Sequence, residues 1–468
     1  MCFLNKHFFN NRNHIHFIGI GGSGMYPLAQ ILHSLGYYLT GSDNNDTETL
    51  QAVRDMGIPV YLGQRAENIK GADLIVHTAA ILPDNPELVA AKESGVEVLE
   101  RSQLLGIITE QFGNAICVSG THGKTTVTSM ITQILVMRGD DISAVIGGKL
   151  PIIHGSGRAG KSDTMVCEAC EFQDHFLNLA VDTAVILNVD EDHLDYFKNL
   201  DNIIKSFHKF CENTTRTIVI NGDDANSQKA LEGISGKEII TFGWKPENQW
   251  YPENIRHTDK LLTEFTIMHE GKPFCEAALH VPGEHNILNA VAAAATAANA
   301  GASPEDVSKG LESFRGAGRR FEKYGESGGI TVVDDYAHHP AEIEVTLRAA
   351  SELGFDRVWA VHQPFTYSRT SLLLEDFAKV LSIADKVVLT SIMGGREKNT
   401  LGIHTKDLAE KIPDSIYFDE EDHDPNFELC AQYVCENAAP GDLIITLGCG
   451  DVNKLSRRIL ELLESKYN

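Results

Sequence analysis

The chain has 468 residues, of which 43% are hydrophobic and 22% charged, and its formal net charge at pH 7 is −25. The length predicts two or three domains rather than one core, and the composition is that of a globular enzyme rather than a disordered or fibrous chain. Because so acidic a surface repels phosphate backbones, general binding to nucleic acid or to an anionic membrane is excluded. A small phosphorylated substrate in a locally basic pocket remains compatible with this charge.

No apolar stretch is long enough to span a bilayer, and Met1–Asn10 lacks the features of a signal peptide. We therefore expect a cytoplasmic protein. Its nine cysteines are scattered from Cys2 to Cys449 and are expected to be reduced thiols. Cys167 and Cys170 form a C-x-x-C pair without a second ligand pair, which favours inert thiols over a zinc or redox site.

Short apolar runs alternate with stretches of helical length along the chain. The predicted strands are His14–Ile20, Leu74–His77, Ala115–Ser119, Ala184–Asn188, Thr217–Asn221, Thr331–Asp334, Val358–His362, Lys386–Thr390 and Asp442–Leu447. Runs that are apolar on both faces suit buried parallel strands. Their alternation with helices predicts α/β domains with parallel sheets.

The pattern restarts at three points, where a strand runs into a glycine-rich turn or a charged loop. These starts are His16–Gly24, Ile116–Thr126 and Thr331–Pro340. We therefore predict three domains, spanning residues 1–111, 112–326 and 327–468. Trp244–Lys272 is the least periodic stretch and predicts a small antiparallel insertion.

The first glycine-rich turn has the pattern G-x-G-x-x-G at Gly19, Gly21 and Gly24, between a predicted strand and a predicted helix. Asp43 follows at about the distance at which a dinucleotide-binding fold places its ribose-binding acid. Glycines let the backbone approach a pyrophosphate at the helix start. Because NAD and UDP both carry a pyrophosphate and a ribose, this turn alone leaves both open, together with a tight turn that binds nothing.

The second turn, Ser119–Thr126, is the stronger signal because it has the phosphate-loop sequence G-T-x-G-K-T between a strand and a helix. Its backbone N–H groups can hold phosphate oxygens, Lys124 can reach the β- and γ-phosphates, and the Thr125 hydroxyl can bind Mg²⁺. Val118 stands where a full Walker A motif has its first glycine. The alternative is a chance glycine turn.

Acidic residues follow two further predicted strands. Glu168 and Glu171 come after one, and the run Asp190–Asp195, which contains His193, comes after the other. Because the carboxyl ends of parallel strands meet at one edge of a sheet, we expect these groups near the phosphate loop. Mg²⁺ prefers oxygen ligands and bridges the phosphates of ATP, and His193 could add a nitrogen.

Taken together, these motifs resemble the Mur ligase family along nearly the whole chain. The matching stretches are His16–Gly22, Gly120–Thr126, Asp192–Asp195, Gly283–Ala290, Gly318–Glu322, Asp334–Pro340, Gln363–Pro364 with Tyr367–Thr370, Arg396–Lys398 and Gly448–Asp451. Their occurrence in this order is far more specific than any single motif.

The resemblance implies a Rossmann-like UDP-sugar domain, a central phosphate-loop ATPase and a Rossmann-like C-terminal domain. It implies that ATP, with Mg²⁺ or Mn²⁺, activates the lactyl carboxylate of UDP-N-acetylmuramate as an acyl phosphate, which the amine of L-alanine then attacks. The product serves peptidoglycan precursor synthesis. A monomer or weak homodimer is expected.

The resemblance also implies the site residues. UDP-sugar contacts are expected at Gly19, Gly21, Gly22, Ser23, Gly24, Ser42, Asp43, His77 and Arg101. ATP contacts are expected at Gly120, Thr121, His122, Gly123, Lys124, Thr125, Thr126, His285, Asn286, Asn289, Arg320 and Asp335, with metal ligands Thr125, Glu168 and His193. Tyr336, His338 and Arg369 are expected at the incoming amino acid, and the expected catalytic residues are Lys124, His193, His338 and Arg320.

Two positions depart from the family pattern. Gln64 stands where a histidine is frequent, and Phe365 replaces the histidine of a common Gln-Pro-His-x-Tyr stretch. The second departure leaves the accepted amino acid open, because Phe365 could narrow the pocket or His362 could substitute for the missing histidine. His338 is expected either to deprotonate the amine or only to bind it. The competing functions are a tripeptide or folate ligase, an NAD-dependent oxidoreductase and a non-catalytic UDP-sugar sensor.

Overall fold

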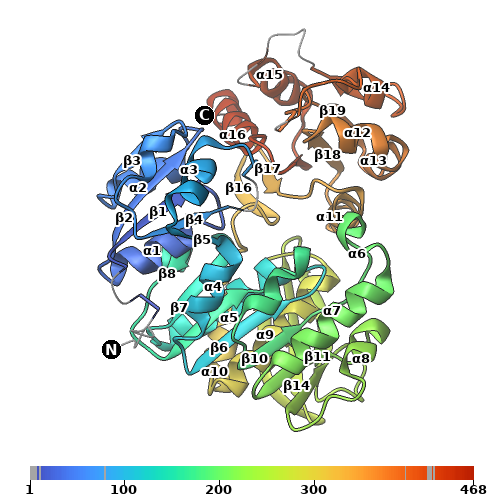
Figure 1. Ribbon diagram of the computed structural model, residues 1–468. Helices are drawn as coiled ribbons and strands as arrows, with labels where there is room; N and C mark the ends of the chain where they lie inside the picture. The colour runs from blue at the N-terminus through green and yellow to red at the C-terminus, as the bar shows by residue number, and fades with distance from the viewer. Residues whose placement is uncertain are drawn as a thin grey trace. The chain divides into compact units, whose positions relative to one another are not determined.

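The computed structural model describes residues 8–9, 12–78, 81–395, 397–418, 424 and 427–467 (Figure 1). Most of the N-terminal segment Met1–Asn10 and the motif residue Arg396 lie outside these residues. The chain divides into two compact units, described here one by one. The first unit contains residues 1–255, 265–278 and 287–314, and the second contains residues 256–264, 279–286 and 315–468.

The first sheet of the first unit is fully parallel, with the strand order β3-β2-β1-β4-β5. Its elements are β1 (His14–Ile18), α1 (Tyr26–Ser34), β2 (Tyr38–Asp43), α2 (Glu48–Asp55), β3 (Val60–Leu62), η1 (Ala66–Ile69), β4 (Leu74–His77), α3 (Pro86–Ser94), β5 (Glu97–Glu100) and α4 (Arg101–Thr109). The order changes direction at β1, so the turn after β1 lies where open α/β sheets bind ligands.

The second sheet has the strand order β15-β14-β13-β12-β11-β10-β6-β9-β7-β8. Its first elements are β6 (Asn114–Ser119), α5 (Lys124–Arg138), β7 (Ser143–Leu150), η2 (Pro151–Ile153), β8 (Gly155–Arg158), β9 (Thr164–Glu168), η3 (Phe172–Asn178), β10 (Thr183–Ile186), α6 (Leu194–Phe197) and α7 (Leu200–Asn213). The later ones are β11 (Thr217–Asn221), α8 (Ala225–Leu231), β12 (Glu238–Phe242), β13 (Trp250–Asp259), β14 (Leu262–His269), β15 (Lys272–Leu279), α9 (Glu284–Asn299) and α10 (Pro304–Glu312). The two-residue links among β13, β14 and β15 make these strands antiparallel hairpins, which confirms the predicted insertion.

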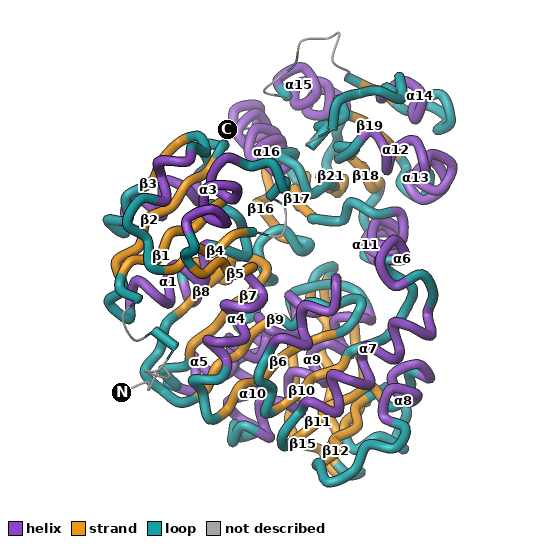
Figure 2. The backbone as a smooth tube through the Cα atoms, in the orientation of Figure 1, coloured by secondary structure: helices purple, strands orange, loops and turns teal. Residues whose placement is uncertain are grey.

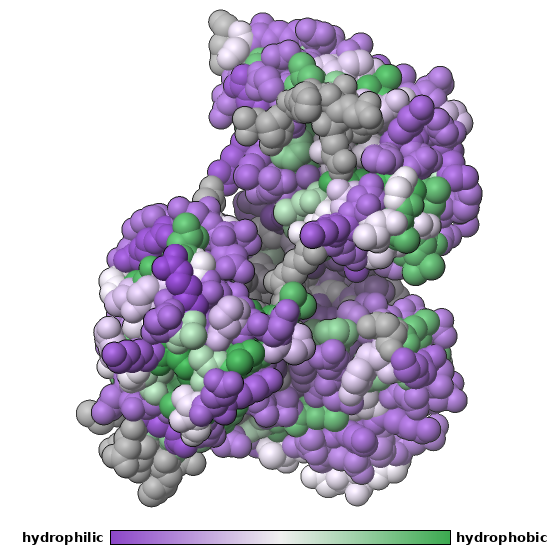
Figure 3. Space-filling model, turned by 45° about the horizontal axis from the view of Figure 1, so that its top comes forward, coloured by the Kyte–Doolittle hydropathy of each residue, from purple (hydrophilic) through white to green (hydrophobic). Residues whose placement is uncertain are grey.

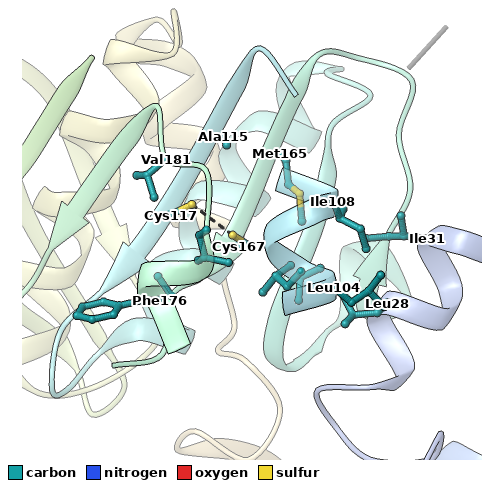
Figure 4. Packing of buried hydrophobic residues seen from close by; sticks show 14 of the residues in the cluster. Leu28, Ile31, Leu104, Ile108, Ala115, Cys117, Met165, Cys167, Phe176 and Val181 are labelled. Carbon is teal, nitrogen blue, oxygen red and sulfur yellow. Dashed lines mark hydrogen bonds between the residues drawn. The ribbon is translucent and has the colours of Figure 1, made fainter. Parts of the chain in front are cut away.

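One continuous apolar core joins these two sheets within the first unit. Leu28 and Ile31 of α1 and Leu104 and Ile108 of α4 pack in the same cluster as residues of β6 and β9 (Figure 4). The fit is close, because a Cβ at Gly157 of β8 would lie 2.6 Å from the Cα of Pro27. The first sheet is therefore packed firmly against the second.

Cys117 and Cys167 lie opposite each other on β6 and β9 in this core, with their Sγ atoms 3.5 Å apart (Figure 4). Both are free thiols and fully buried. Burial also raises the pKa of the half-buried Cys170 thiol. Cys167 and Cys170 thus fit the expectation of unreactive thiols.

The third sheet, in the second unit, has the order β16-β17-β21-β18-β19-β20 and is parallel except for the β16–β17 pair. Its elements are β16 (Glu322–Ser327), β17 (Ile330–Asp335), α11 (Pro340–Ser351), β18 (Arg357–His362), α12 (Tyr367–Leu372), α13 (Leu374–Leu381), β19 (Lys386–Leu389), α14 (Thr405–Ala409), β20 (Ile416–Tyr417), α15 (Glu428–Asn437), β21 (Asp442–Leu447) and α16 (Asn453–Tyr467). Helices cover both faces (Figure 2). Alternate residues of β18 enter two separate cores, Val358 and Ala360 with α11 and α13, Trp359 and Val361 with α15 and α16.

The three sheets confirm the predicted α/β fold, and every predicted strand is present within two residues. The predicted boundary between residues 326 and 327 falls inside β16, which pairs with β17 and therefore belongs to the third sheet. In the described part of the chain, no helix has the length and apolarity needed to cross a membrane. The face shown in Figure 3 is mostly hydrophilic, with scattered apolar residues.

Candidate active site

The phosphate loop joins β6 to α5 and requires glycine at two positions. Gly120 and Gly123 have φ angles of 142° and 87°. A Cβ at Gly120 would lie 2.9 Å from the Cβ of Leu187, and one at Gly123 would lie 2.8 Å from Oδ1 of Asn289. A side chain is therefore excluded at both positions. Gly123 directly precedes the first turn of α5, whose N–H groups can bind an anion.

The loop after β10 holds the phosphate loop in place. The backbone N–H of Thr121 donates to the carbonyl of Asn188 (3.1 Å), and that of His122 donates to Oδ1 of Asn188 (2.8 Å). The N–H of Asp190 donates to the hydroxyl of Thr121 (2.9 Å). These bonds connect the ends of two neighbouring parallel strands, so the acidic run 190–195 lies beside the phosphate loop as predicted.

Lys124 is held between this loop and a buried carboxylate. Its Nζ donates to the carbonyls of Gly120 (2.6 Å) and Thr121 (3.1 Å) and lies 2.9 Å from Oε2 of Glu171, whose side chain is only 2% exposed. Burial is the largest single influence on the pKa of Lys124 and would lower it, but Glu171, Cys170 and Glu168 together outweigh burial, so the pKa is raised. Lys124 is therefore a fixed positive charge at the phosphate loop.

Three side chains can share one cation beside this lysine. Ligand atoms of Glu171, Asp192 and His193 lie within 4.8 Å of one another. His193 has a left-handed backbone (φ 52°), and its ring lies 4.7 Å from the ring of Phe172. Two carboxylates and an imidazole suit Mg²⁺ or Mn²⁺. This group shares His193 with the set expected from the sequence and has Glu171 in place of Glu168.

Glu168 and Thr125 have different surroundings. Glu168 is the last residue of β9, and its carboxylate accepts a 2.5 Å hydrogen bond from the backbone N–H of Gly147 in β7. Thr125 and Thr126 lie half-buried in the first turn of α5, next to Lys124. The structure thus brings both threonines to the phosphate loop and gives Glu168 a backbone partner.

The residues expected near the adenine lie at the start of α9. The amide of Asn286 is 8% exposed and donates to the carbonyl of Pro282 (2.7 Å), and His285 is exposed beside Gly283. Asn289 lies against Gly123 of the phosphate loop. Of the three, Asn289 is the one that this geometry brings to the phosphate loop.

The first glycine turn is fixed by Asp43 at the end of β2. Oδ2 of Asp43 accepts from the N–H of Gly21 (3.1 Å), and Oδ1 accepts from the N–H of Asn45 (3.1 Å). Gly19 has a φ of 85°, and its N–H donates to the carbonyl of Ser42 (2.8 Å). The acid expected to bind ribose therefore also braces the loop.

Ser42, which is expected among the UDP-sugar contacts, has a hydrogen-bond partner of its own within the protein. Its side chain is fully buried, and its hydroxyl donates to Oε2 of Glu87 (2.5 Å). Glu87 is also fully buried, lies 3.6 Å from Nε2 of His16, and accepts from the N–H of Arg65 (3.3 Å). Sequence reasoning missed Glu87, because a helical glutamate 45 residues from Ser42 carries no local signal.

The remaining residues of this region surround the same turn. Ser23 is exposed, Gly22 and Gly24 are half-buried, and a Cβ at Gly24 would lie 2.9 Å from Cδ of Arg101. Nδ1 of His77, the last residue of β4, lies 3.0 Å from the carbonyl of Thr78. Arg101 thus lies directly on the glycine turn and supplies a positive charge there.

In the second unit, two adjacent arginines have different roles. Arg319 is left-handed (φ 62°), and its guanidinium donates to Asp334 (2.9 Å) and to the carbonyls of Gly448 and Gly450. Both guanidiniums lie over the ring of Tyr336, that of Arg319 5.1 Å and that of Arg320 5.3 Å from its centre. Arg319 therefore fixes the loop after β21, and Arg320 is not bound in that way. Sequence analysis singled out only Arg320.

Asp335 is the last residue of β17, and Tyr336 directly follows it. Both oxygens of Asp335 accept from backbone N–H groups, those of Phe321 and Ala337, at 2.8 Å each. Burial raises the pKa of this carboxyl, and Arg320 opposes the rise. Burial also raises the pKa of Tyr336, whose side chain is partly exposed.

His338 is paired with a carboxylate that sequence analysis did not single out. Nδ1 of His338 lies 3.1 Å from Oε2 of Glu342, and the N–H of His338 donates to the same oxygen. Burial alone would raise the pKa of Glu342, but these contacts lower it well below its usual range. Because Nδ1 faces the carboxylate, Nε2 of His338 is the nitrogen that can meet a substrate.

Arg369 lies in the first turn of α12, three residues after the Thr366 N-cap. Its backbone N–H donates to the Thr366 hydroxyl (3.3 Å). Glu397 accepts from the N–H (2.8 Å) and hydroxyl of the neighbouring Ser368. These bonds fix the start of the helix that carries the arginine.

The phosphate loop, the fixed lysine and the carboxylates that can hold a cation beside it are typical of a nucleotide-using enzyme, and comparison with known proteins gives the family. Family models match in succession: "Mur ligase family, catalytic domain" at residues 14–113, "Mur ligase middle domain" at 118–297 and "Mur ligase, glutamate ligase domain" at 319–450. The chain belongs to the Mur ligase family.

Several relatives are similar over their full length. UDP-N-acetylmuramate–L-alanine ligases from Agathobacter rectalis and Acetivibrio thermocellus are each 44% identical, covering 97% of this chain and 99% and 96% of theirs. Among solved structures, the UDP-N-acetylmuramate–alanine ligase of Thermotoga maritima is 28% identical with a TM-score of 0.81, covering 97% of this chain and 99% of that one. These similarities confirm the predicted family and three-domain architecture.

Proposed function

We propose that the protein ligates L-alanine to the lactyl carboxylate of UDP-N-acetylmuramate, using ATP and forming ADP and phosphate. The observation that carries the proposal is the phosphate loop with Lys124 paired to Glu171 beside His193, in a chain of this family. Full-length relatives at 44% identity that bear this activity in their names support the choice of substrates. The activity belongs to peptidoglycan precursor synthesis.

The first step transfers the γ-phosphate to the carboxylate and is mainly a matter of position and charge. The N–H groups of the phosphate loop and Nζ of Lys124 would hold the β- and γ-phosphates, and Arg320 would neutralise charge on the transferred group. Glu171, Asp192 and His193 would hold Mg²⁺, or Mn²⁺, with Thr125 and Glu168 as the further ligands that the resemblance implies. An ion held there would supply positive charge for the transferred phosphoryl group.

In the second step the amine of alanine attacks the acyl phosphate, and phosphate leaves. His338 is oriented by Glu342 through Nδ1, so its Nε2 would accept the proton that the amine loses. Arg369 would bind the alanine carboxylate, since a guanidinium suits a carboxylate, and Tyr336 would lie at the same substrate. Because an acyl phosphate hydrolyses readily, the site must exclude water during this step.

UDP-N-acetylmuramate is assigned to the first glycine turn rather than NAD. Gly19, Gly21 and Gly24 would allow the pyrophosphate to approach the backbone. Arg101 would supply positive charge, and Asp43 would hydrogen-bond a ribose hydroxyl. We propose a cytoplasmic location, where ATP and UDP-sugars are present, and a monomer or weak homodimer.

One assay tests this function. Phosphate release is measured with ATP, Mg²⁺ and UDP-N-acetylmuramate, adding L-alanine, L-serine, glycine or a tripeptide in turn. We expect release that depends on L-alanine, with lower rates for serine and glycine. Release with the tripeptide alone would instead assign a peptide-recycling ligase, and no release with any single amino acid would refute the proposal.

A further inference from the structure

Three buried polar atoms at the carboxyl edge of the third sheet have no hydrogen-bond partner among the described residues. They are Nε2 of His362, Nη1 of Arg369 and Oγ1 of Thr390. His362 is the last residue of β18, Thr390 directly follows β19, and Arg369 lies in the helix after β18. Because buried polar groups are nearly always paired, each of these atoms lacks a partner that a ligand could supply, and His362 is the one whose surroundings are best defined.

His362 is the most constrained of the three. Its side chain is 1% exposed, and its ring stacks on Phe377 with centroids 5.5 Å apart. Nδ1 lies 3.0 Å from the carbonyl of Leu447, which can only accept a hydrogen bond, so Nδ1 carries the proton. Nε2 therefore presents a lone pair in a buried place.

The ring stays neutral at physiological pH. Burial lowers the pKa of His362 to about 4, and the hydrogen bond to Leu447 and the charge of His338 modify this effect. A neutral acceptor can receive an N–H from a cationic group without repelling it. A free amino acid offers such a group in its α-ammonium, next to a carboxylate.

The same neighbourhood holds the residues proposed for the amino acid. His338 acts electrostatically on His362. Phe365, in the loop that follows His362, has its ring 6.5 Å from the ring of His338. Phe365 stands where the family pattern has a histidine, and its ring offers no hydrogen-bond acceptor.

We propose that Nε2 of His362 accepts a hydrogen bond from the α-ammonium of the incoming amino acid and so positions it for attack. This inference rests on the proposed function, and it assigns His362 to substrate positioning rather than to proton transfer. His362 thereby performs the binding role that Phe365 lacks. A larger substrate without a free α-ammonium near this edge would not use the contact.

Two substitutions test the roles of Nδ1 and Nε2 of His362 separately. In His362→Asn the amide nitrogen lies near the place of Nδ1 and keeps the bond to Leu447, while the acceptor at Nε2 is lost. In His362→Gln the longer amide reaches the place of Nε2. We expect the KM for L-alanine to rise about 10-fold in H362N, which equals about 1.4 kcal/mol, and to rise less than threefold in H362Q. The KM values for ATP and UDP-N-acetylmuramate should stay within about twofold of wild type.

Phe377→Leu is the matched control, because it removes the stacked ring and leaves Nε2 in place. It should lower the melting temperature without raising the KM for L-alanine. Equal KM changes in H362N and H362Q, or an unchanged KM in H362N, would overturn the inference. Wild-type turnover with L-alanine is measured in the same series, so its absence would refute the proposed function instead.

Discussion

The carboxylate of Glu171 gives the sharpest prediction, because it faces both Lys124 and the cation group. In Glu171→Gln the side chain keeps its size and loses its charge. We expect the Mg²⁺ concentration for half-maximal activity to rise by at least the ~10–100-fold that loss of a supporting metal-site group costs. The measurement is phosphate release over a Mg²⁺ titration at saturating substrates.

The same change also removes the charge partner of Lys124. Opposite charges 2.9 Å apart attract by about 6 kcal/mol at an effective dielectric constant of ~20, and desolvation offsets much of this. Since Lys124 keeps two carbonyl partners, we expect a net loss of about 2–3 kcal/mol in the free energy of unfolding. Differential scanning calorimetry should then show the first unit melting about 4–12 °C lower.

Glu168→Gln is the matched control, three residues earlier in the chain and chemically identical. It loses a charged acceptor for the N–H of Gly147 and should shift the Mg²⁺ requirement less than Glu171→Gln does. If Glu168→Gln alone shifts that requirement, the reasoning from the Glu171, Asp192 and His193 group is refuted. The metal would then depend on the residue at the end of β9.

Lys124→Ala should abolish phosphate release and leave UDP-N-acetylmuramate binding unchanged by calorimetry; loss of both would indicate misfolding. Ser42→Ala leaves the buried Glu87 without its hydroxyl donor and should cost about 1–3 kcal/mol of stability in urea unfolding, whereas an unchanged midpoint would show that this bond is dispensable. The pKa of Glu342 is lowered in the folded state, so its contribution to stability is present above about pH 4.3, the pKa of the unfolded chain, and is lost as pH falls through the lower folded value. The stability gap between wild type and Glu342→Gln should therefore be full at pH 6 and shrink towards pH 3, and a gap that widens on acidification would contradict the sign of this shift.

The fold could be predicted because its signals are local. Strands such as Asp442–Leu447 are apolar on both faces, and the phosphate loop combines its glycines, lysine and threonine within one turn. The prediction that Cys167 and Cys170 are inert thiols also rests on a general property, because free cysteines are usually buried and unreactive. These features depend on residues that are adjacent in sequence, so they can be recognised from a single sequence.

The parts that could not be predicted depend on backbone geometry or on distant partners. Glu168 ends a strand and Glu171 follows it by three residues, and which of them meets His193 depends on the path of the loop between them. Arg319 and Arg320 are neighbours in sequence, but it is Arg319, with its left-handed backbone, that donates to carbonyls of the loop after β21. The roles of the individual site residues remain predictions.

The third sheet has a consequence for how the protein folds. β21 is the last strand among the described residues, yet it lies between β17 and β18 and pairs with both. Until residues 442–447 are made, the β16–β17 hairpin and the β18–β19–β20 group have no strand to join them and present open edges. The sheet must therefore close late and through contacts distant in sequence, which slows folding. A truncation just before Asp442 should yield aggregating protein rather than a smaller stable domain.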